Sequence, residues 1–242
     1  MSYDLTKFKH GLEELNITLT DEQIEQFLQY YEMLVEKNKV MNLTGITEYE
    51  EVIQKHFLDS LSLIRVIPDI ASQKLTVIDL GTGAGFPGIP LKIAFPELEI
   101  TLMDSLNKRI LFLQEVIDAL GQKKVSAVHG RAEEMSSNAT HRQQYDLCVS
   151  RAVSNLAVLT EYCLPFVKKG GLFVSYKSAD SDAEIQEGKK AISILGGKLT
   201  SVDKFQLPDS DLRRALVCIK KVKDTPKKYP RKAGTPAKLP LK

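Results

Sequence analysis

The chain has few cysteines, and it lacks any apolar run of the roughly 18 residues that a membrane-spanning helix needs. Its three cysteines have no metal-site spacing, so we expect Cys148, Cys163 and Cys218 to be small buried apolar side chains. None of the four histidines has neighbours with metal-ligand spacing, and no metal site is expected. No basic segment followed by an apolar one opens the chain, so no signal peptide is expected. These absences predict a soluble cytoplasmic protein that does not enter a membrane.

Charge is unevenly distributed. The net charge is only +2, but residues 220–242 hold nine Lys or Arg and one Asp, so the rest of the chain is acidic. A basic, proline-containing tail is poor at forming a core and suited to phosphate groups, which would favour nucleic acid as a partner. A tail that is merely solvated would have the same composition. With 242 residues, the chain can bury one α/β core and a modest extension.

The first 70 residues have the pattern of helices. Thr20 with Gln23, and Thr47 with Glu50, have the spacing of capping boxes, and each pair precedes apolar residues at helical spacing. We therefore divide the chain into a helical cap (1–70), a central domain (71–222) and a basic tail (223–242).

Strands and helices alternate in the central domain. The strands are expected at 75–80, 99–104, 125–129, 145–150 and 172–176. The helices are expected at 89–95, 108–120, 155–166 and 183–195, with residues 168–171 ending the third helix. Such alternation predicts a parallel sheet covered on both faces. Two final strands, 198–205 and 213–220, follow with no helix between them, which is typical of the seven-stranded methyltransferase sheet and not of the dinucleotide-binding order.

A glycine cluster directly follows the first strand of this sheet. Gly83-x-Gly85-x-x-Gly88 fits the dinucleotide fingerprint, with Asp104 near the expected distance for a ribose-binding acid. Pro87 opposes that reading, because proline has no N–H for a pyrophosphate.

The alternative unit is Asp79-x-Gly81-x-Gly83-x-Gly85, which resembles the first motif of S-adenosylmethionine-dependent methyltransferases. Asp79 would suit a cationic sulfonium and amino group better than a pyrophosphate. The motif and the terminal strand pair together favour a methyltransferase over a nicotinamide dehydrogenase.

In such a sheet, ligands lie beyond the carboxyl ends of the strands. Asp104 could accept hydrogen bonds from ribose hydroxyls, or it could simply cap the next helix. After the third strand, Ala132 could pack on an adenine ring and Glu133 could accept from its amino group. Arg151 follows the fourth strand and offers a planar cation for a carboxylate or phosphate, or it forms a surface ion pair at a helix start.

The loop after the fourth strand lacks the Asn/Asp-Pro-Pro-aromatic run of adenine methyltransferases and the Pro-Cys pair of cytosine C5 enzymes. No general base is evident, so no catalytic residue is assigned. Guanine N7 has an in-plane lone pair and no proton to lose, and catalysis there would reduce to positioning.

Several motifs occur in a characteristic order. They are His56-Phe57-Leu58-Asp59-Ser60-Leu61, the stretch from Gly81 to Pro90, Met103-Asp104-Ser105, Arg131-Ala132-Glu133-Glu134 and Ser150-Arg151-Ala152. In these motifs the chain resembles the bacterial small-subunit ribosomal RNA guanine-N7 methyltransferase family, also called RsmG or glucose-inhibited division protein B. The resemblance runs from the cap to the end of the sheet.

The resemblance implies methyl transfer from S-adenosylmethionine to N7 of one guanosine in small-subunit ribosomal RNA, with the RNA or the assembling small subunit as partner. It places the cofactor at Gly81, Phe86, Ala132, Glu133 and Arg151. Asp79, Gly83 and Asp104 join these on the arguments above, and we expect His56, Arg131 and Lys177 to line the RNA side. A methyltransferase with another acceptor, either another RNA or a small molecule, is the alternative. We expect a monomer.

Overall fold

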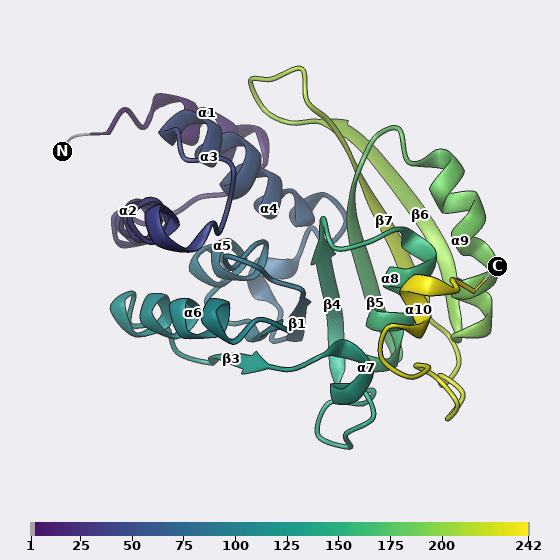
Figure 1. Ribbon diagram of the computed structural model, residues 1–242. Coiled ribbons are helices and arrows are strands. Elements are labelled where there is room, and N and C mark those ends of the chain that lie inside the picture. The colour runs from purple at the N-terminus through teal and green to yellow at the C-terminus, as the bar shows by residue number, and fades with distance from the viewer. Residues whose placement is uncertain (1–2, 242) are drawn as a thin grey trace.

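Helices dominate the first 70 residues, and the computed structural model describes residues 3–241. The helical elements are α1 (Thr6–Glu14), α2 (Asp21–Met41), α3 (Tyr49–Val52), the π-helical segment η1 (Ile53–Leu58), α4 (Asp59–Leu61) and the 3₁₀ turns η2 (Ser62–Arg65) and η3 (Ile70–Ser72). In Figure 1 they lie beside one end of the sheet.

One of the two predicted capping boxes is confirmed. The Thr20 hydroxyl accepts from the Gln23 N–H at 3.2 Å, and the Gln23 side chain accepts from the Thr20 N–H at 2.9 Å. The box at Thr47 is wrong, because α3 starts one residue later, after Glu48, without a side-chain cap. The Thr47 carbonyl instead accepts from the Tyr31 hydroxyl.

The predicted seven-stranded sheet is confirmed for residues 3–241. Its order is β3-β2-β1-β4-β5-β7-β6, in which the first five strands are parallel and β7 runs antiparallel to both β5 and β6. The strands are β1 (Thr76–Leu80), β2 (Glu99–Asp104), β3 (Val125–His129), β4 (Tyr145–Arg151), β5 (Val167–Ser178), β6 (Gly197–Gln206) and β7 (Arg213–Lys221).

Strand β5 is longer than the sequence predicts. Residues 168–171 belong to this strand, although two lysines and two glycines at that point resemble a helix end. A Cβ atom on Gly171 would lie 2.6 Å from the Asp146 carbonyl oxygen. The missing side chain therefore lets β5 pass close to β4, where the register of the pair shifts between Tyr145 and Leu147.

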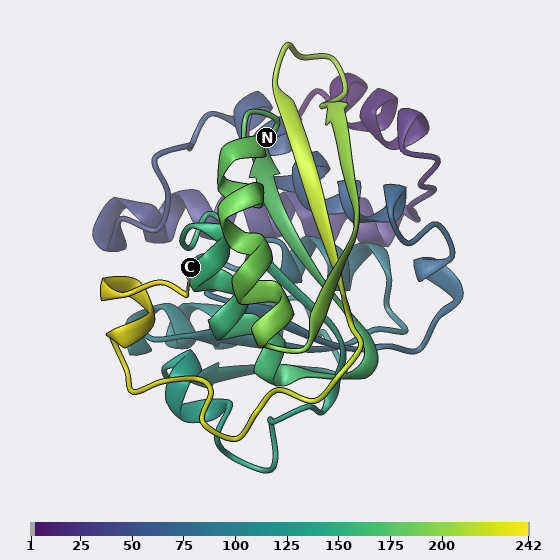
Figure 2. The ribbon, with the colours of Figure 1, turned by 90° about the vertical axis from the view of Figure 1, so that its right-hand side faces the viewer.

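Helices cover both faces of the sheet. The covering elements are α5 (Gly88–Ala94), α6 (Asn107–Ala119), α8 (Leu156–Cys163), the turn η4 (Leu164–Phe166) and α9 (Asp182–Ile194). The short helices α7 (Ala132–Met135) and α10 (Thr235–Lys238) pack against α8. Alternate strand residues face opposite sides: Val77 packs with α5, α6 and the cap, and Ile78 packs with α8 and α9. Figure 2 shows α9 in front of the sheet on the second side. The three cysteines are buried and free, as expected.

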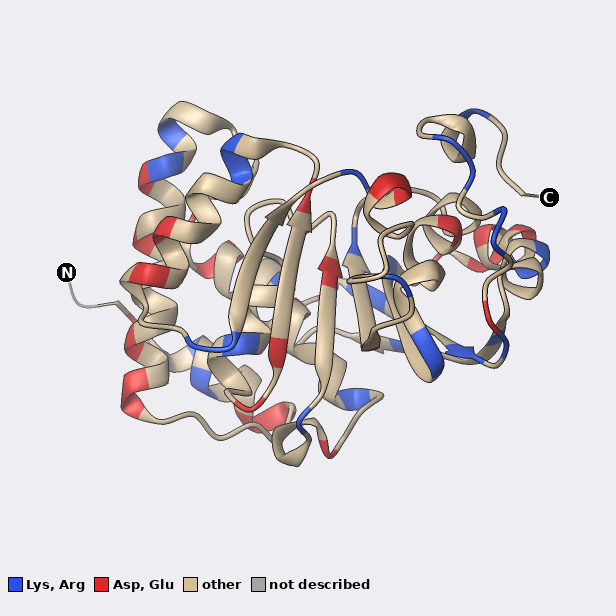
Figure 3. Cartoon of the chain, turned by 90° about the horizontal axis from the view of Figure 1, so that it is seen from below, with Lys and Arg blue, Asp and Glu red and all other residues tan. Residues whose placement is uncertain are grey.

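The C-terminal segment, residues 222–241, packs against the body of the protein. Tyr229 is buried, and the Arg142 guanidinium donates to the carbonyls of Thr225 and Tyr229, each at 3.0 Å. Lys and Arg residues recur along the segment (Figure 3), and Lys227, Lys228 and Lys232 are exposed. One side of the tail is therefore anchored while several of its cations face solvent.

An aromatic cluster joins the cap to the glycine loop. Phe27, Tyr30 and Phe57 are buried, and the Tyr30 and Phe86 rings lie 5.4 Å apart. The Tyr30 hydroxyl donates to the Ala84 carbonyl at 2.7 Å. Burial raises the pKa of Tyr30, so this hydroxyl stays protonated. The cap thereby holds the glycine loop in place.

Replacement of Tyr30 by phenylalanine should lower the free energy of unfolding by about 1–3 kcal/mol, because the buried Ala84 carbonyl loses its donor. Urea unfolding would measure this. Tyr31→Phe is the matched control: Tyr31 is partly exposed, water can replace its hydroxyl, and the loss should be smaller. Equal losses in the two variants would contradict this role for Tyr30.

Candidate functional site

Two adjoining cavities open at the carboxyl ends of the strands. The first, of about 440 Å³, lies beyond β1, β2, β3 and β4, and its walls include Gly81, Asp104, Arg131, Ala132, Glu133, Ala152, Val153, Tyr162, Gly234 and Ala237. The second, of about 400 Å³, lies between the cap and β4, β5 and β7, and its walls include Lys55, His56, Asp59, Arg151, Ala152, Tyr176, Lys177 and Arg214. Ala152 lines both, so the two cavities meet at this residue. Each is large enough for a small-molecule ligand.

The glycine loop forms one wall of the first cavity. Gly81 and Gly83 have φ values of +71° and +63°, which favour glycine. A Cβ on Gly81 would lie 2.5 Å from a methyl group of Val153, whereas one on Gly83 would have only the Gly81 carbonyl oxygen near it, at 4.0 Å. Gly81 thus allows the loop to approach the β4 side of the cavity.

Asp104 ends β2 and is almost fully buried. Its Oδ2 accepts from the Gly83 N–H at 3.0 Å and from Arg109 at 3.2 Å, and its Oδ1 accepts from the Leu106 N–H at 2.9 Å. A carboxylate offers about four lone-pair positions. Asp104 can therefore hold the glycine loop and still accept a hydrogen bond from a ligand.

Asp79 lies beneath the glycine loop and is fully buried. Its Oδ2 accepts from the Thr82 hydroxyl at 2.7 Å and from the Gly88 N–H at 2.8 Å. Its Oδ1 has no hydrogen-bond partner within residues 3–241. Burial raises the pKa of Asp79 to about 7, against the lowering effect of these two bonds. Asp79 therefore acts on the loop, and it is not among the residues that line the cavity.

His56 is held as a neutral imidazole in the second cavity. Burial, and then the nearby Arg151, lower its pKa to about 3. Arg151 donates to its Nδ1 at 3.1 Å, so the proton lies on Nε2, which is 2.9 Å from the Thr44 hydroxyl. The ring stacks on Phe86 at 4.3 Å. His56 thus presents no positive charge near neutral pH.

A carboxylate between two arginines organises the same cavity. Asp59, on α4, accepts from Arg151 at 2.8 Å through Oδ2 and from Arg214 at 3.2 Å through Oδ1. Arg151 also lies over the Phe86 ring, 5.0 Å from its centre. Lys177 donates to the Ser154 carbonyl and to Glu184, each at 2.6 Å. The cations of this cavity are therefore largely fixed by acidic or carbonyl groups.

The structure sorts the residues singled out in the sequence into three groups. Gly81, Asp104, Arg131, Ala132 and Glu133 line the first cavity, and His56, Arg151 and Lys177 line the second. Asp79, Gly83 and Phe86 are not among the residues that line either cavity: Asp79 and Gly83 form hydrogen bonds that hold the glycine loop, and Phe86 stacks on His56. Arg131 thus lies apart from His56 and Lys177, with which it was grouped. Arg151 ends β4 and does not start a helix.

Several wall residues, among them Asp59, Arg214 and Tyr162, had no assigned role in the sequence analysis. Asp59 lies within the motif that begins at His56, and that motif was its signal. The sequence held no comparable signal for Arg214 or Tyr162. Arg214 pairs with Asp59 across 155 residues, and Tyr162 is one apolar residue among many on α8.

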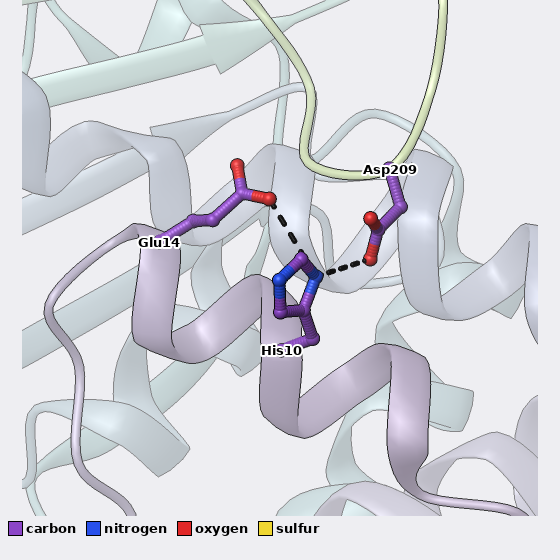
Figure 4. Close-up of side chains that lie close together, drawn as sticks. All are labelled: His10, Glu14 and Asp209. Atoms are coloured by element: carbon purple, nitrogen blue, oxygen red, sulfur yellow. Dashed lines mark hydrogen bonds and ion pairs between the residues drawn. The ribbon is translucent and has the colours of Figure 1, made fainter.

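The expectation that no histidine has metal-ligand neighbours is wrong for His10 (Figure 4). Glu14 lies one helical turn away, and the β6–β7 loop brings Asp209 to 2.7 Å from His10 Nδ1. All three are exposed. The hydrogen bond to Asp209 raises the pKa of His10, so the pairing accounts for the cluster as a contact between α1 and the loop.

Comparison with known proteins shows a matching family model and similar proteins of the same name. The model of the family GidB, described as rRNA small subunit methyltransferase G, matches residues 23–217. Proteins named ribosomal RNA small subunit methyltransferase G are similar over nearly the whole chain: that of Lachnoclostridium phytofermentans is 56% identical over 238 residues (98% of each chain), and that of Alkaliphilus metalliredigens is 54% identical over 234 residues (97% of each).

Solved structures share the fold at low sequence identity. TYW2 of M. jannaschii, in complex with AdoMet, has a TM-score of 0.51 at 13% identity and covers 68% of this chain and 77% of its own. A protein from Pyrococcus horikoshii has a TM-score of 0.54 at 12% identity, with 69% of this chain and 64% of its own chain covered.

Replacement of Asp79 by asparagine should change how stability depends on pH. The folded-state pKa of about 7 exceeds the unfolded value, so the folded protein binds the extra proton and wild-type stability falls as pH rises from about 4 to 7. The asparagine amide cannot ionise. As pH rises from 5 to 8, we therefore expect the free energy of unfolding of Asp79→Asn to increase by about 2 kcal/mol relative to that of wild type. Urea unfolding at several pH values measures the difference. Parallel pH curves would mean that burial does not raise the pKa of Asp79.

Proposed function

This chain belongs to the family of rRNA small subunit methyltransferase G, and we propose that it transfers a methyl group to N7 of one guanosine in small-subunit ribosomal RNA. The observation that carries the proposal is the junction at Ala152. There a cavity built on the glycine loop meets a second cavity lined by arginines and a neutral histidine. A donor in the first cavity and a base in the second would face each other at this point.

S-adenosylmethionine is the cofactor, and it supplies a methyl group on a positively charged sulfur. The first cavity fits it in size and in chemistry. We assign Asp104 to the ribose hydroxyls, Ala132 and Glu133 to the adenine ring and its amino group, and the loop at Gly81 to the amino-acid part. The open space beside Gly83 is consistent with close approach of a ligand to the backbone.

The second cavity has the groups that guanine recognition needs. Guanine presents O6 and N7 as acceptors on one edge, and arginine is the usual partner of that edge. N7 must stay free to attack, so we assign Arg151 or Arg214 to O6 alone. The neutral His56 ring and Phe86 behind it offer an aromatic surface beside the base. Lys177 also lines this cavity.

Catalysis in this arrangement is positioning. N7 needs no base, because its lone pair carries no proton, and methylation leaves a positive charge on the purine. The nearby arginines would repel this charge. Asp59 lies between the two arginines, and its negative charge offsets part of that repulsion. Holding the donor and acceptor in line can lower the barrier by about 7–11 kcal/mol.

The proposed activity also implies a binding partner and a cellular location. We propose that the exposed lysines of the tail meet RNA phosphates, that the partner is the RNA or the assembling small subunit, and that the protein acts in the cytoplasm as a monomer. Residues 1–70 would then serve as cap, 71–222 as the methyltransferase domain and 223–242 as the tail. Within residues 3–241, no helix is both long and apolar enough to span a membrane.

Incubation with methyl-labelled S-adenosylmethionine and small subunits from a strain without this activity should label one guanosine. Sensitivity of that site to borohydride and aniline cleavage would identify N7. Gly81→Val should reduce labelling at least a hundredfold, because its side chain would collide with Val153 in the first cavity.

Gly121→Val is the matched control for that variant. Gly121 also has a positive φ, +60°, but nothing lies within 4 Å of its Cβ and it is not in either cavity, so labelling should persist. Absence of label on both subunits and free RNA, with cofactor binding intact, would contradict the assigned acceptor.

A further inference from the structure

The C-terminal segment reaches the first cavity from outside the region that the family model matches. That model ends at residue 217, and residues 222–241 continue from β7 toward α7 and α8 (Figure 2). The end of this segment supplies Gly234 and Ala237 to the cavity wall. The wall of the first cavity therefore includes a part of the chain that belongs to neither the sheet nor the cap.

A buried ion pair anchors the segment. Glu161, on α8, is fully buried, and its carboxylate accepts from Arg231 through Nε at 2.9 Å and through Nη2 at 2.6 Å. The Arg231 backbone N–H donates to the same carboxylate at 2.8 Å. A two-pronged pair of this kind fixes geometry as well as charge. Since a buried carboxylate without its cation is strongly unfavourable, Glu161 ties the segment to α8.

Three residues beyond the anchor, the segment contacts a wall residue of the cavity directly. The Gly234 N–H donates to Oε1 of Glu133 at 2.9 Å. Gly234 has a φ of +80°, which turns the chain into α10 and brings Ala237 to the cavity. The contact leaves Oε2 of Glu133 available to accept from a ligand, and it fixes the orientation of the carboxylate.

We propose that residues 231–237 are part of the S-adenosylmethionine site and set the affinity for its adenosine end. Arg231 fixes the segment on α8, Gly234 orients Glu133, and Ala237 closes the cavity over the ligand. The inference rests on the proposed function, because it takes the first cavity to be the cofactor site.

Two alanine-to-phenylalanine variants test the contact. Ala237 and Ala233 are both exposed and lie four residues apart, but only Ala237 lines the cavity. In calorimetric titrations with S-adenosylmethionine, Ala237→Phe should raise Kd at least tenfold, because the ring occupies ligand space. Ala233→Phe should stay within twofold of wild type. Equal Kd values for wild type and Ala237→Phe would overturn the proposal.

Gly81→Val in the same titration separates this proposal from the proposed function. If wild type binds and Gly81→Val does not, the first cavity is the cofactor site, and an unaffected Ala237→Phe then counts against the C-terminal segment alone. If wild type itself does not bind S-adenosylmethionine, the proposed function fails with it.

Release of the segment provides a second test. The double variant Glu161→Gln, Arg231→Gln removes the ion pair without leaving a buried charge unpaired. Trypsin cleavage at the exposed lysines from Lys227 to Lys238 would report whether the segment is released, and thermal unfolding would confirm that the sheet is intact. A released segment should accompany a Kd at least fivefold higher. Cleavage of the segment with unchanged Kd would overturn the proposal.

Discussion

The site depends on one buried carboxylate under the glycine loop. Asp79 joins the Thr82 hydroxyl and the Gly88 N–H, and so closes the loop between the end of β1 and the start of α5. Asp104 and Tyr30 hold the same loop from β2 and from the cap. These three residues fix the backbone that lines the first cavity, and Tyr30 also belongs to the apolar core that the cap shares with the sheet. The acid next to the last residue of β1 therefore acts by shaping the loop.

In the second cavity, ion pairs and burial set the charges of the side chains. Two arginines face one aspartate, and burial beside Arg151 keeps His56 neutral. A cavity of unpaired cations would oppose a reaction that creates a positive charge on its substrate. The ion pairs of Arg151 and Arg214 with Asp59 keep the N–H donors of both arginines in place. They also reduce the repulsion between these arginines and the positively charged product. The cap supplies Asp59 and His56, so it contributes to the site as well as to the core.

The succession of strands along the chain and the ligand edge could be predicted from the sequence, because β1 to β4 are short apolar runs ending in Asp79-Leu80, Asp104, His129 and Arg151. The sequence did not predict which side chains line which cavity. Arg131 follows β3 and Arg151 ends β4, but Arg151 pairs with Asp59, 92 residues earlier, across the cap interface. The anchor of Arg231 to Glu161 likewise spans 70 residues, whereas composition alone indicated a tail that is poor at forming a core. Such long-range pairs depend on tertiary packing, which local patterns do not encode.

The most direct test of this account is a crystal structure of the protein with S-adenosylhomocysteine, the demethylated form of the donor. We predict the adenosine between Asp104, Ala132 and Glu133, and the sulfur atom facing Ala152 where the two cavities meet. Adenosine in the second cavity beside His56 and Arg151, or a sulfur atom directed away from Ala152, would contradict it.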